Sequence, residues 1–369
     1  MLADPRAVVT AASIGFTAYR VRRLARFGAA RHRLVAPPDR PRITTVSAVV
    51  PARDEARHIA ECLEALCLSG PDLTEVVVVD DASRDGTALA ASRAGPSVRV
   101  LPSPGPQVGQ LGKPVACAAG AATARGEWLW FVDADVRVAP DLLNRLLRAA
   151  DERDADLVSA VGRLVTVDPL SGWLLPAVGL AVARRHDPDL IADPTSSAAF
   201  AAGPCLLIRR SVYNAVGGHL AVADQVVEDV ALARLVKAHG GQVVLATTLD
   251  GYSAQMYDDA RACWVGLLKN TSAVRSGPWP AGAAAAALGF APVALLQSRS
   301  TSTRRLAAVA VAAQVVTDGA ARARARQPVW PAALSPLTDL LLAVHHAQAR
   351  WLRHRGRPVG WRGRPVPVG

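Results

Sequence analysis

An apolar run from Trp128 to Val132 ends abruptly in two carboxylates, Asp133 and Asp135, and this feature most limits the fold of the chain. Apolar runs of this length that end at polar residues are typical of buried strands in a parallel sheet. In open α/β sheets, ligands bind just beyond the carboxyl ends of such strands. Two acids placed there, one residue apart, can hold a hard divalent cation against phosphate oxygens. Taken alone, the pair fits a solvated turn equally well.

Strand patterns alternate with helix patterns around this run. The strand patterns cover 46–50, 75–79, 98–101 and 127–132, and the helix patterns cover 55–68, 85–92, 114–124 and 140–150. This alternation predicts an α/β fold in which a mostly parallel sheet carries helices on both faces. After Leu157 the pattern is weaker. We expect strands at 204–208 and 242–247 and a helix at 227–239, while 168–200 fits either an amphipathic helix or a mobile acceptor loop.

The charge of the chain points to an anionic partner. Its 369 residues carry a net charge of +11, which comes almost entirely from Arg. Such a balance suits nucleic acid, anionic lipid or phosphate-bearing ligands. No nucleic-acid module or zinc-ligand spacing is present, and Arg residues cluster beside apolar segments at both ends, so we expect a membrane and no nucleic acid. The five cysteines are widely spaced and form no Cys-x-x-Cys, which is typical of reduced thiols in a cytosol-facing domain.

Apolar segments at both ends predict membrane-associated parts. An apolar run at 7–19 precedes several Arg residues and indicates an anchoring helix, and three apolar blocks follow at 279–296, 306–321 and 330–344. The first block lacks charge and comes closest to the roughly 20 residues that a membrane helix needs. Basic residues flank the middle block, so the positive-inside rule gives no consistent three-span topology. One span with interfacial or paired helices, or Ala-rich core helices of a soluble domain, are the open alternatives.

Polar motifs follow the predicted strands in an ordered series. They are Pro51-Ala52-Arg53-Asp54-Glu55, Asp80-Asp81, Gly112-Lys113, Asp133-Ala134-Asp135 and Glu228-Asp229. This series, over about residues 45–270, resembles the inverting family 2 glycosyltransferases. The resemblance implies a GT-A fold, a doubly wound and mostly parallel sheet with helices on both faces. It also implies four parts: an anchor and linker at 1–44, the GT-A domain at 45–270, hydrophobic membrane-associated helices at 271–347 and a basic tail at 348–369.

The first motifs predict a nucleotide site. Acids at the ends of adjacent parallel strands can accept hydrogen bonds from a base N–H and from ribose hydroxyls. Glu55, Asp80 and Asp81 are therefore candidates for uracil and ribose recognition, which the family's matching acids perform, and Pro51 is assigned to the same site. Lys113 begins a predicted helix after a Gly-rich loop, where its charge and the helix dipole together suit phosphate. A solvated lysine is the alternative.

The later motifs predict a metal ion and a general base. By resemblance, Asp135 ligates Mn²⁺ or Mg²⁺, and Asp133 supports it through ribose or a metal-bound water. Such a metal offsets negative charge on the leaving diphosphate. The family's Glu-Asp pair matches Glu228-Asp229, which makes Asp229 the expected base with Glu228 beside it. An acidic first turn favoured by the helix dipole is the alternative. His219, after Gly217-Gly218, is expected either to contact acceptor or diphosphate or to lie in a capping turn.

Several further segments resemble the membrane-associated, lipid-modifying branch of the family. They are Met256-Tyr257, Trp264, Lys269-Asn270 and Trp361-Arg362-Gly363-Arg364, although Gln255 stands where that branch often has a basic residue. The resemblance implies a cell-membrane enzyme whose catalytic domain faces the cytoplasm. It would move a sugar from a nucleotide sugar, by expectation a UDP-sugar, to a lipid-like acceptor with inversion. A processive polysaccharide synthase and a non-catalytic scaffold that binds nucleotide sugar or lipid are the alternatives.

Overall fold

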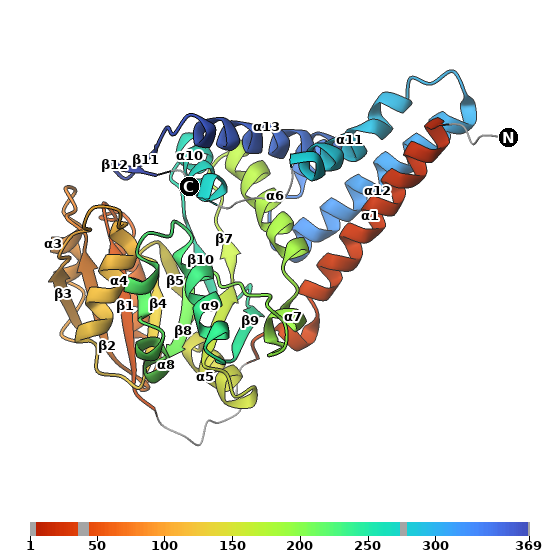
Figure 1. Ribbon diagram of the computed structural model, residues 1–369. Coiled ribbons are helices and arrows are strands. Elements are labelled where there is room, and N and C mark those ends of the chain that lie inside the picture. Colours follow the sequence, from red (N-terminus) through yellow and green to blue (C-terminus); the bar gives the residue numbers. More distant parts are fainter. Residues whose placement is uncertain (1–4, 36–43, 274–278, 368–369) are drawn as a thin grey trace. The chain divides into compact units, whose positions relative to one another are not determined.

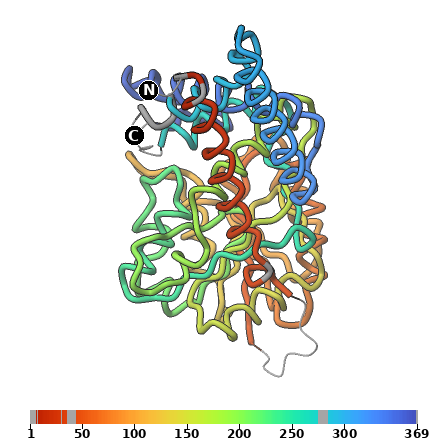
Figure 2. The backbone as a smooth tube through the Cα atoms, turned by 90° about the vertical axis from the view of Figure 1, so that its right-hand side faces the viewer, coloured from red at the N-terminus to blue at the C-terminus, as the bar shows by residue number. Residues whose placement is uncertain are grey.

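The computed structural model describes residues 5–35, 44–273 and 279–367, and the chain divides into two compact units. The sheet unit consists of Gly28–Val165 and His186–Met256. The helical unit consists of Met1–Phe27, Thr166–Arg185 and Tyr257–Gly369. The helical unit therefore consists of three separate segments of the chain, whose path can be followed by colour in Figures 1 and 2.

A seven-stranded sheet forms the centre of the sheet unit, in the order β3-β2-β1-β4-β8-β6-β9. Its strands are β1 (Val46–Ala52), β2 (Leu73–Asp80), β3 (Val98–Pro102), β4 (Trp128–Val132), β6 (Leu157–Val161), β8 (Cys205–Arg209) and β9 (Val243–Thr247). All neighbouring pairs are parallel except those of β8, which runs antiparallel to both β4 and β6. The predicted mostly parallel α/β sheet is confirmed, and β1, β2 and β4 direct their carboxyl ends to the same edge.

Helices cover both faces of this sheet, as predicted. Beyond the strands, the sheet unit contains η1 (Ala30–His32), α2 (Ile59–Cys67), α3 (Thr87–Ser92), α4 (Gly112–Thr123), α5 (Leu142–Glu152), α7 (Pro188–Ala192), α8 (Arg210–Ala215), η2 (Gly218–Val222) and α9 (Glu228–Ala238). The α2 and α5 helices share a large apolar core with one set of strand side chains, including those of Val46, Ala48 and Val50 on β1. On the opposite face α4 packs against Val77 and Val79 of β2.

Small residues let α4 approach the sheet closely. A Cβ placed on Gly120 would lie 2.5 Å from Val49 Cγ1 and 3.0 Å from Val79 Cγ2, distances at which real atoms would have to move. Because Lys113 lies in the first turn of this helix, the close packing at Gly120 helps to fix its place relative to β1 and β2.

A second, three-stranded sheet lies beyond the end of β4. It has the order β5-β10-β7, with β5 (Val136–Val138), β10 (Tyr252–Ala254) and β7 (Arg163–Leu164). The sequence patterns did not predict it, because its strands are only two or three residues long. It matters for the site, since β5 follows Asp135 directly and the backbone N–H of Gln255 donates to Asp135 O at 3.1 Å.

The helical unit contains α1 (Pro5–Phe27), α6 (Pro169–Arg185), α10 (Ala260–Ala273), α11 (Trp279–Leu295), α12 (Thr301–Arg324), η3 (Trp330–Leu334) and α13 (Ser335–His354), and a short hairpin of β11 (Val359–Trp361) and β12 (Arg364–Val366). The α1 and α12 helices are far apart in the sequence but lie side by side (Figures 1 and 2). The region 168–200, left open by the sequence, forms α6 here and α7 in the sheet unit.

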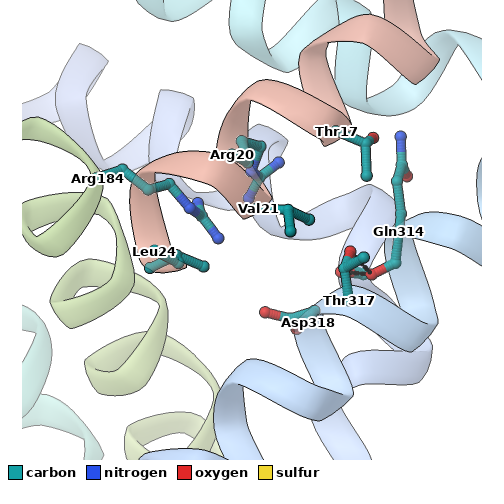
Figure 3. Close-up of a pocket in the computed structure, with 9 residues that line it drawn as sticks. Thr17, Arg20, Val21, Leu24, Arg184, Gln314, Thr317 and Asp318 are labelled. Atoms are coloured by element: carbon teal, nitrogen blue, oxygen red, sulfur yellow. Dashed lines mark hydrogen bonds between the residues drawn. The ribbon is translucent and has the colours of Figure 1, made fainter. Parts of the chain in front are cut away.

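The interior of the helical unit contains charged groups as well as apolar side chains. Arg322 is fully buried, and its guanidinium donates to Asp318 Oδ2 at 2.9 Å and to Gly172 O at 3.0 Å. Arg20 pairs with Asp339 at 2.6 Å. Figure 3 shows the small pocket beside these groups, where Arg184 and Gln314 point between α1, α6 and α12.

One helix within the described ranges, α12, is long and apolar enough to cross a membrane by length and composition. The expectation that block 279–296 comes closest to a span is not borne out by this criterion. Its helix, α11, has 17 residues with Pro292 inside it, and residues 274–278 lie outside the described part. The predicted middle block, 306–321, extends to 24 residues because the helix begins at Thr301, where the Ser300 hydroxyl accepts a hydrogen bond from Thr303 N at 3.4 Å.

Candidate active site at the carboxyl edge of the sheet

Two loops at the ends of β1 and β2 are joined by hydrogen bonds between side chains and backbone. Asp85 Oδ2 accepts from Ala56 N at 2.9 Å, and its Oδ1 accepts from Thr87 N at 3.1 Å. The hydroxyl of Thr87 in turn accepts from Glu55 N at 2.8 Å. Asp54 has a positive φ of 52°, and its carboxylate accepts from Arg84 N at 2.8 Å. The motif around Asp85 is therefore a turn and cap, which binds the two loops together.

These loops set the positions of the predicted nucleotide-binding residues. Pro51 is paired in register with Val79, and Asp80 ends β2 opposite Ala52. Asp81 N donates to Ala52 O at 2.8 Å, and the Asp81 side chain is buried. Asp80 Oδ2 accepts from Ser83 N at 3.3 Å, whereas Asp80 Oδ1 is buried and accepts no hydrogen bond from the residues that the structure describes. A buried acceptor of this kind suits a polar ligand group.

The predicted metal-binding acids lie in the turn that follows β4. Asp133 O accepts from Val136 N at 3.1 Å, which closes the turn, and Asp135 is buried. Cys62 of α2 lies beneath them, with its Sγ 3.6 Å from Asp133 O. Burial, followed by the charges of Asp135, Asp133 and Glu55, raises the pKa of the Cys62 thiol. The Cys62 thiol thus lies directly against the backbone of the Asp-x-Asp turn.

Lys113 joins two of the predicted acidic motifs. Its Nζ lies 2.7 Å from Asp133 Oδ1 and 2.9 Å from Glu228 Oε1, and its side chain is 38% exposed. Burial lowers the pKa of Lys113, but Asp133 and Glu228 outweigh that effect and raise it well above its usual value. The lysine is therefore a permanent cation between carboxylates that stand 95 positions apart in the sequence.

Asp229 lies in the first turn of α9 and is held by two backbone donors. Gly203 N donates to its Oδ2 at 2.6 Å, and Val230 N donates to its Oδ1 at 2.8 Å. Burial and the neighbouring Glu228 carboxylate raise the pKa of Asp229 to about 7, against the opposing effects of Lys113 and of these hydrogen bonds. A carboxylate that titrates near neutral pH can both accept and release a proton, as a general base must.

Gly203 closely approaches two of the predicted site residues, a contact that the sequence patterns did not indicate. A Cβ at this position would lie 3.0 Å from Asp229 Oδ2 and 3.2 Å from Lys113 Nζ. A side chain at this position would therefore require both charged groups to shift by a few tenths of an ångström. The one available signal was its place just before strand β8, but such glycines also occur in ordinary turns.

His219 is a packing residue in this structure. Its ring is buried, packs edge-on against Phe131 of β4 with ring centroids 4.4 Å apart, and lies 3.1 Å from Tyr213 Oη through Nδ1. Burial and the nearby Lys113 charge lower the pKa of His219 to about 3, so the ring is neutral. Its contacts attach η2 to β4 and account for the residue without a ligand.

Within the described ranges, no three or more His, Cys, Asp or Glu side chains are grouped so as to hold a metal ion by themselves. The carboxyl edge of the sheet nevertheless brings together hard oxygen ligands, a lysine cation and a carboxylate that titrates near neutrality. Such an edge is where α/β proteins bind nucleotides and related ligands.

Comparison with known proteins finds similarity to glycosyltransferases in this part of the chain. The family model described as Glycosyl transferase family 2 matches residues 47–217, which include β1, β2, β4 and Lys113. The solved structure of the mannosyltransferase PcManGT from Pyrobaculum calidifontis, in complex with GDP-Man and Mn²⁺, resembles this chain with a TM-score of 0.55 at 21% identity, covering 93% of this chain and 97% of that one. At this identity the likeness concerns the fold, which is GT-A-like.

Two curated relatives agree with this assignment. The succinoglycan biosynthesis protein ExoO of Rhizobium meliloti (strain 1021) is 36% identical over 135 residues, which are 34% of this chain and 38% of the relative. The 4,4'-diaponeurosporenoate glycosyltransferase of Staphylococcus aureus (strain MRSA252) is 27% identical over 243 residues, which are 63% of this chain and 62% of the relative. In both cases the match covers less than two thirds of the relative. The match to the model described as Glycosyl transferase family 2 thus covers the part of the chain that holds most of the candidate site residues, 47–217.

Proposed function

We propose that this protein transfers a sugar from a nucleotide sugar, with a UDP-sugar as the expected donor, to a lipid-like acceptor with inversion at the anomeric carbon. The observation that carries the proposal is the arrangement around Lys113, whose ammonium group joins Asp133 to Glu228 next to Asp229 inside a family 2 domain. This arrangement would supply a cation for the leaving diphosphate and a base for the acceptor hydroxyl.

The nucleotide would bind at the ends of β1 and β2. Pro51 and Glu55 from the first loop and Asp80 and Asp81 from the second would contact the base and ribose. The buried and unbonded Asp80 Oδ1 supports this assignment, because a ribose hydroxyl or a base N–H would supply the missing hydrogen bond. The diphosphate would then lie toward Asp133 and Lys113, where the lysine cation favours negative charge.

The residues present suit a divalent metal. Asp135 and Asp133 offer the oxygen ligands that Mn²⁺ and Mg²⁺ accept, and the Lys113 ammonium on Asp133 is a cation already held at this place. When bound, such an ion would stabilise the negative charge of the leaving nucleoside diphosphate. The mannosyltransferase PcManGT was solved with Mn²⁺ and GDP-Man, which supports a metal and a nucleotide sugar and keeps GDP among the donors to test.

Asp229 would act as the general base. It would take the proton of the acceptor hydroxyl while the acceptor oxygen bonds to the anomeric carbon and the bond to the diphosphate breaks. A single displacement of this kind inverts the configuration. The pKa of about 7 supports the role, since the base is then ionised at neutral pH yet basic enough to accept a proton. The products would be the glycoside and the nucleoside diphosphate, with the proton on Asp229.

A lipid-like acceptor at the cell membrane, with the catalytic domain facing the cytoplasm, completes the proposal. The name of the Staphylococcus aureus relative describes a glycosyltransferase for 4,4'-diaponeurosporenoate, and that match extends over 63% of this chain. The α12 helix, which could cross a membrane by length and composition, supports a membrane location. Polysaccharide synthesis is the second candidate, and the similarity to the succinoglycan biosynthesis protein favours it.

A thermal-shift experiment on detergent-solubilised protein tests the donor class. UDP, GDP, dTDP and CDP are each added with and without Mn²⁺. A ligand that binds only the folded state at 100 times its Kd adds about 2.7 kcal/mol of stability. A Mn²⁺-dependent shift with UDP that is lost in Asp135→Ala would support donor and metal together. Shifts with GDP alone would replace the UDP assignment, and no shift with any nucleotide would contradict the proposal. Product analysis with a lipid extract or an oligosaccharide as acceptor then separates the two candidate functions.

A further inference from the structure

The Lys113 ammonium group occupies a place that two different ligands would need. It bonds to Asp133 Oδ1 at 2.7 Å, on one of the two proposed metal-binding acids, and to Glu228 Oε1 at 2.9 Å, beside the proposed base. The lysine begins α4, whereas Asp133 follows β4 and Glu228 begins α9. Three elements therefore meet at a single positive charge.

We propose that Lys113 is an exchangeable counter-ion: without donor its ammonium group neutralises Asp133, and the diphosphate of the donor draws it away so that a divalent cation can bind there. The inference rests on the proposed function and deepens it, because it assigns an order to metal and nucleotide binding. A divalent cation alone would have to compete with Lys113 for Asp133. A nucleoside diphosphate would relieve that competition by offering the ammonium group other oxygens.

The geometry allows the exchange. The Lys113 side chain is 38% exposed, so its four-carbon stem is not enclosed by the core, and only its charged end is fixed by ion pairs. The backbone below it is held in place, because α4 packs on the sheet through Gly120. The ammonium group can thus move over a few ångströms while the helix stays where it is.

The second ion pair extends the exchange to the base. While Lys113 bonds to Glu228, its positive charge partly offsets the carboxylate that lies next to Asp229 in the sequence. When the ammonium group moves to the diphosphate, Asp229 faces an uncompensated Glu228. A nearby negative charge makes a carboxylate a stronger base. Donor binding would then both open the metal position and prepare Asp229 for the acceptor proton.

Direct measurement of Mn²⁺ binding tests the exchange without relying on activity. Mn²⁺ affinity is measured by calorimetry on the purified full chain, with and without saturating UDP, for wild type, Lys113→Met, Lys113→Arg and Glu228→Gln. We expect Lys113→Met to bind Mn²⁺ alone about tenfold more tightly than wild type, since the competing charge is gone. Glu228→Gln should instead weaken the binding of Mn²⁺ alone, because the ammonium group has then lost Glu228 and pairs more fully with Asp133. Lys113→Arg keeps the charge and should stay near wild type.

The coupling between the two ligands provides the second readout. UDP should tighten Mn²⁺ binding more strongly in wild type than in Lys113→Met, and by reciprocity Mn²⁺ should tighten UDP binding by the same factor. Equal Mn²⁺ affinity in wild type, Lys113→Met and Glu228→Gln without nucleotide would overturn the exchange while leaving the proposed function intact. Failure of wild type to bind any nucleoside diphosphate, with Mn²⁺ present, would instead overturn the proposed function. If Lys113→Met does not fold, the exchange is tested by Glu228→Gln alone, which should bind Mn²⁺ more weakly than wild type.

Discussion

The two compact units place their charged side chains in opposite ways. In the sheet unit the core consists of apolar strand and helix side chains, and the acids gather where β1, β2 and β4 end. In the helical unit Arg322 and Asp318 pair in the interior among buried apolar side chains, and further large apolar side chains are exposed on the outside. On α12 these include Leu306, Val309 and Val316, whose spacing of three and seven residues places them on one face of the helix.

The difference indicates two different surroundings. An apolar core with polar strand ends is what water as a solvent produces. A polar interior with an apolar exterior is expected where the surroundings are themselves apolar, as in a lipid phase, because buried ionisable groups there pair with one another. Large exposed apolar patches in water also mark sites of association. The five predictions that follow test this contrast, from the largest expected effect to the smallest.

Replacing Asp229 by Asn should remove the base while keeping the fold of the sheet unit. The amide can still accept hydrogen bonds from Gly203 N and Val230 N, but it cannot take a proton. We expect kcat to fall by about 10²–10⁴-fold, the usual contribution of a positioned base. Steady-state kinetics measures the loss, and the exposed Asp224→Asn variant in the same unit is the control. Full activity in Asp229→Asn would show that another group takes the proton.

Replacing Arg322 by Met should show how far the helical unit depends on its buried charges. Arg322 is fully buried and bonds to Asp318, Gly172 O and Trp173 O, so its loss leaves a buried carboxylate and two carbonyls without their donor. Breaking a buried ion pair from one side costs about 3–5 kcal/mol. Unfolding in detergent, followed by circular dichroism, measures the change against the exposed Arg324→Met variant.

A double variant sharpens the same test. Arg322→Met combined with Asp318→Leu removes both charges, and replacement of a whole buried pair by apolar residues is often neutral or stabilising. We expect the double variant to recover much of the stability that the single variant loses. If the single variant loses less than about 1 kcal/mol, the polar interior of this unit is not what holds it together.

The contrast also bears on what the sequence could predict. The parallel sheet and the acids at its edge followed from short apolar runs that end in carboxylates, because this local pattern and the strand direction together determine the edge. The pairing of Lys113 with Glu228 could not be predicted in this way, since it depends on how α4 and α9 pack. The close approach of Gly203 to Asp229 and Lys113 could not be predicted for the same reason.

The helical unit was harder to predict than the sheet unit. Its α1, α6 and α12 helices come from three separate parts of the chain, so no continuous segment of sequence describes its core. The apolar block that was expected to come closest to a span, 279–296, forms a 17-residue helix with Pro292, whereas capping at Ser300 lengthens the less apolar block that follows. Helix length here depends on end signals more than on mean hydropathy.

The pH dependence of turnover should reflect the environment of Asp229. Its pKa is raised to about 7 by burial and by Glu228, and Lys113 acts in the opposite direction. The carboxylate form is the base, so kcat/KM, which reflects the enzyme before donor binding draws Lys113 away, should rise with pH up to about 7 and fall about tenfold for each unit below it. Values of kcat/KM for the donor, measured from pH 5 to pH 9, test the sign. A rate that is constant from pH 5 upward would mean that the base has an ordinary carboxylate pKa.

Replacing Asp85 by Ala should loosen the nucleotide half of the site with a modest loss of stability. Asp85 accepts from Ala56 N and Thr87 N and so joins the loops after β1 and β2. Loss of a capping carboxylate costs about 1 kcal/mol. The hydrogen bonds lower the pKa of Asp85 although burial opposes them, so this stabilisation exists at neutral pH and is lost as the pH falls below the usual carboxylate range. Asp85→Asn, which keeps one acceptor, is the matched control, with UDP affinity and melting temperature as readouts.

Contact between the exposed face of α12 and lipid can be tested with a substitution that hardly changes stability. Val316 is 67% exposed on α12, so Val316→Ser should change the unfolding free energy in detergent by about 0.5 kcal/mol or less. If the α12 face contacts lipid, the same change removes apolar area from that contact, and binding to vesicles of anionic phospholipid should weaken several-fold. Leu89→Ser, an equally exposed apolar position in the sheet unit at 58%, should leave vesicle binding unchanged. Equal vesicle binding by wild type and both variants would mean that the apolar exterior of α12 does not contact lipid, and the contrast between the two units would then need another cause, such as association with a second protein.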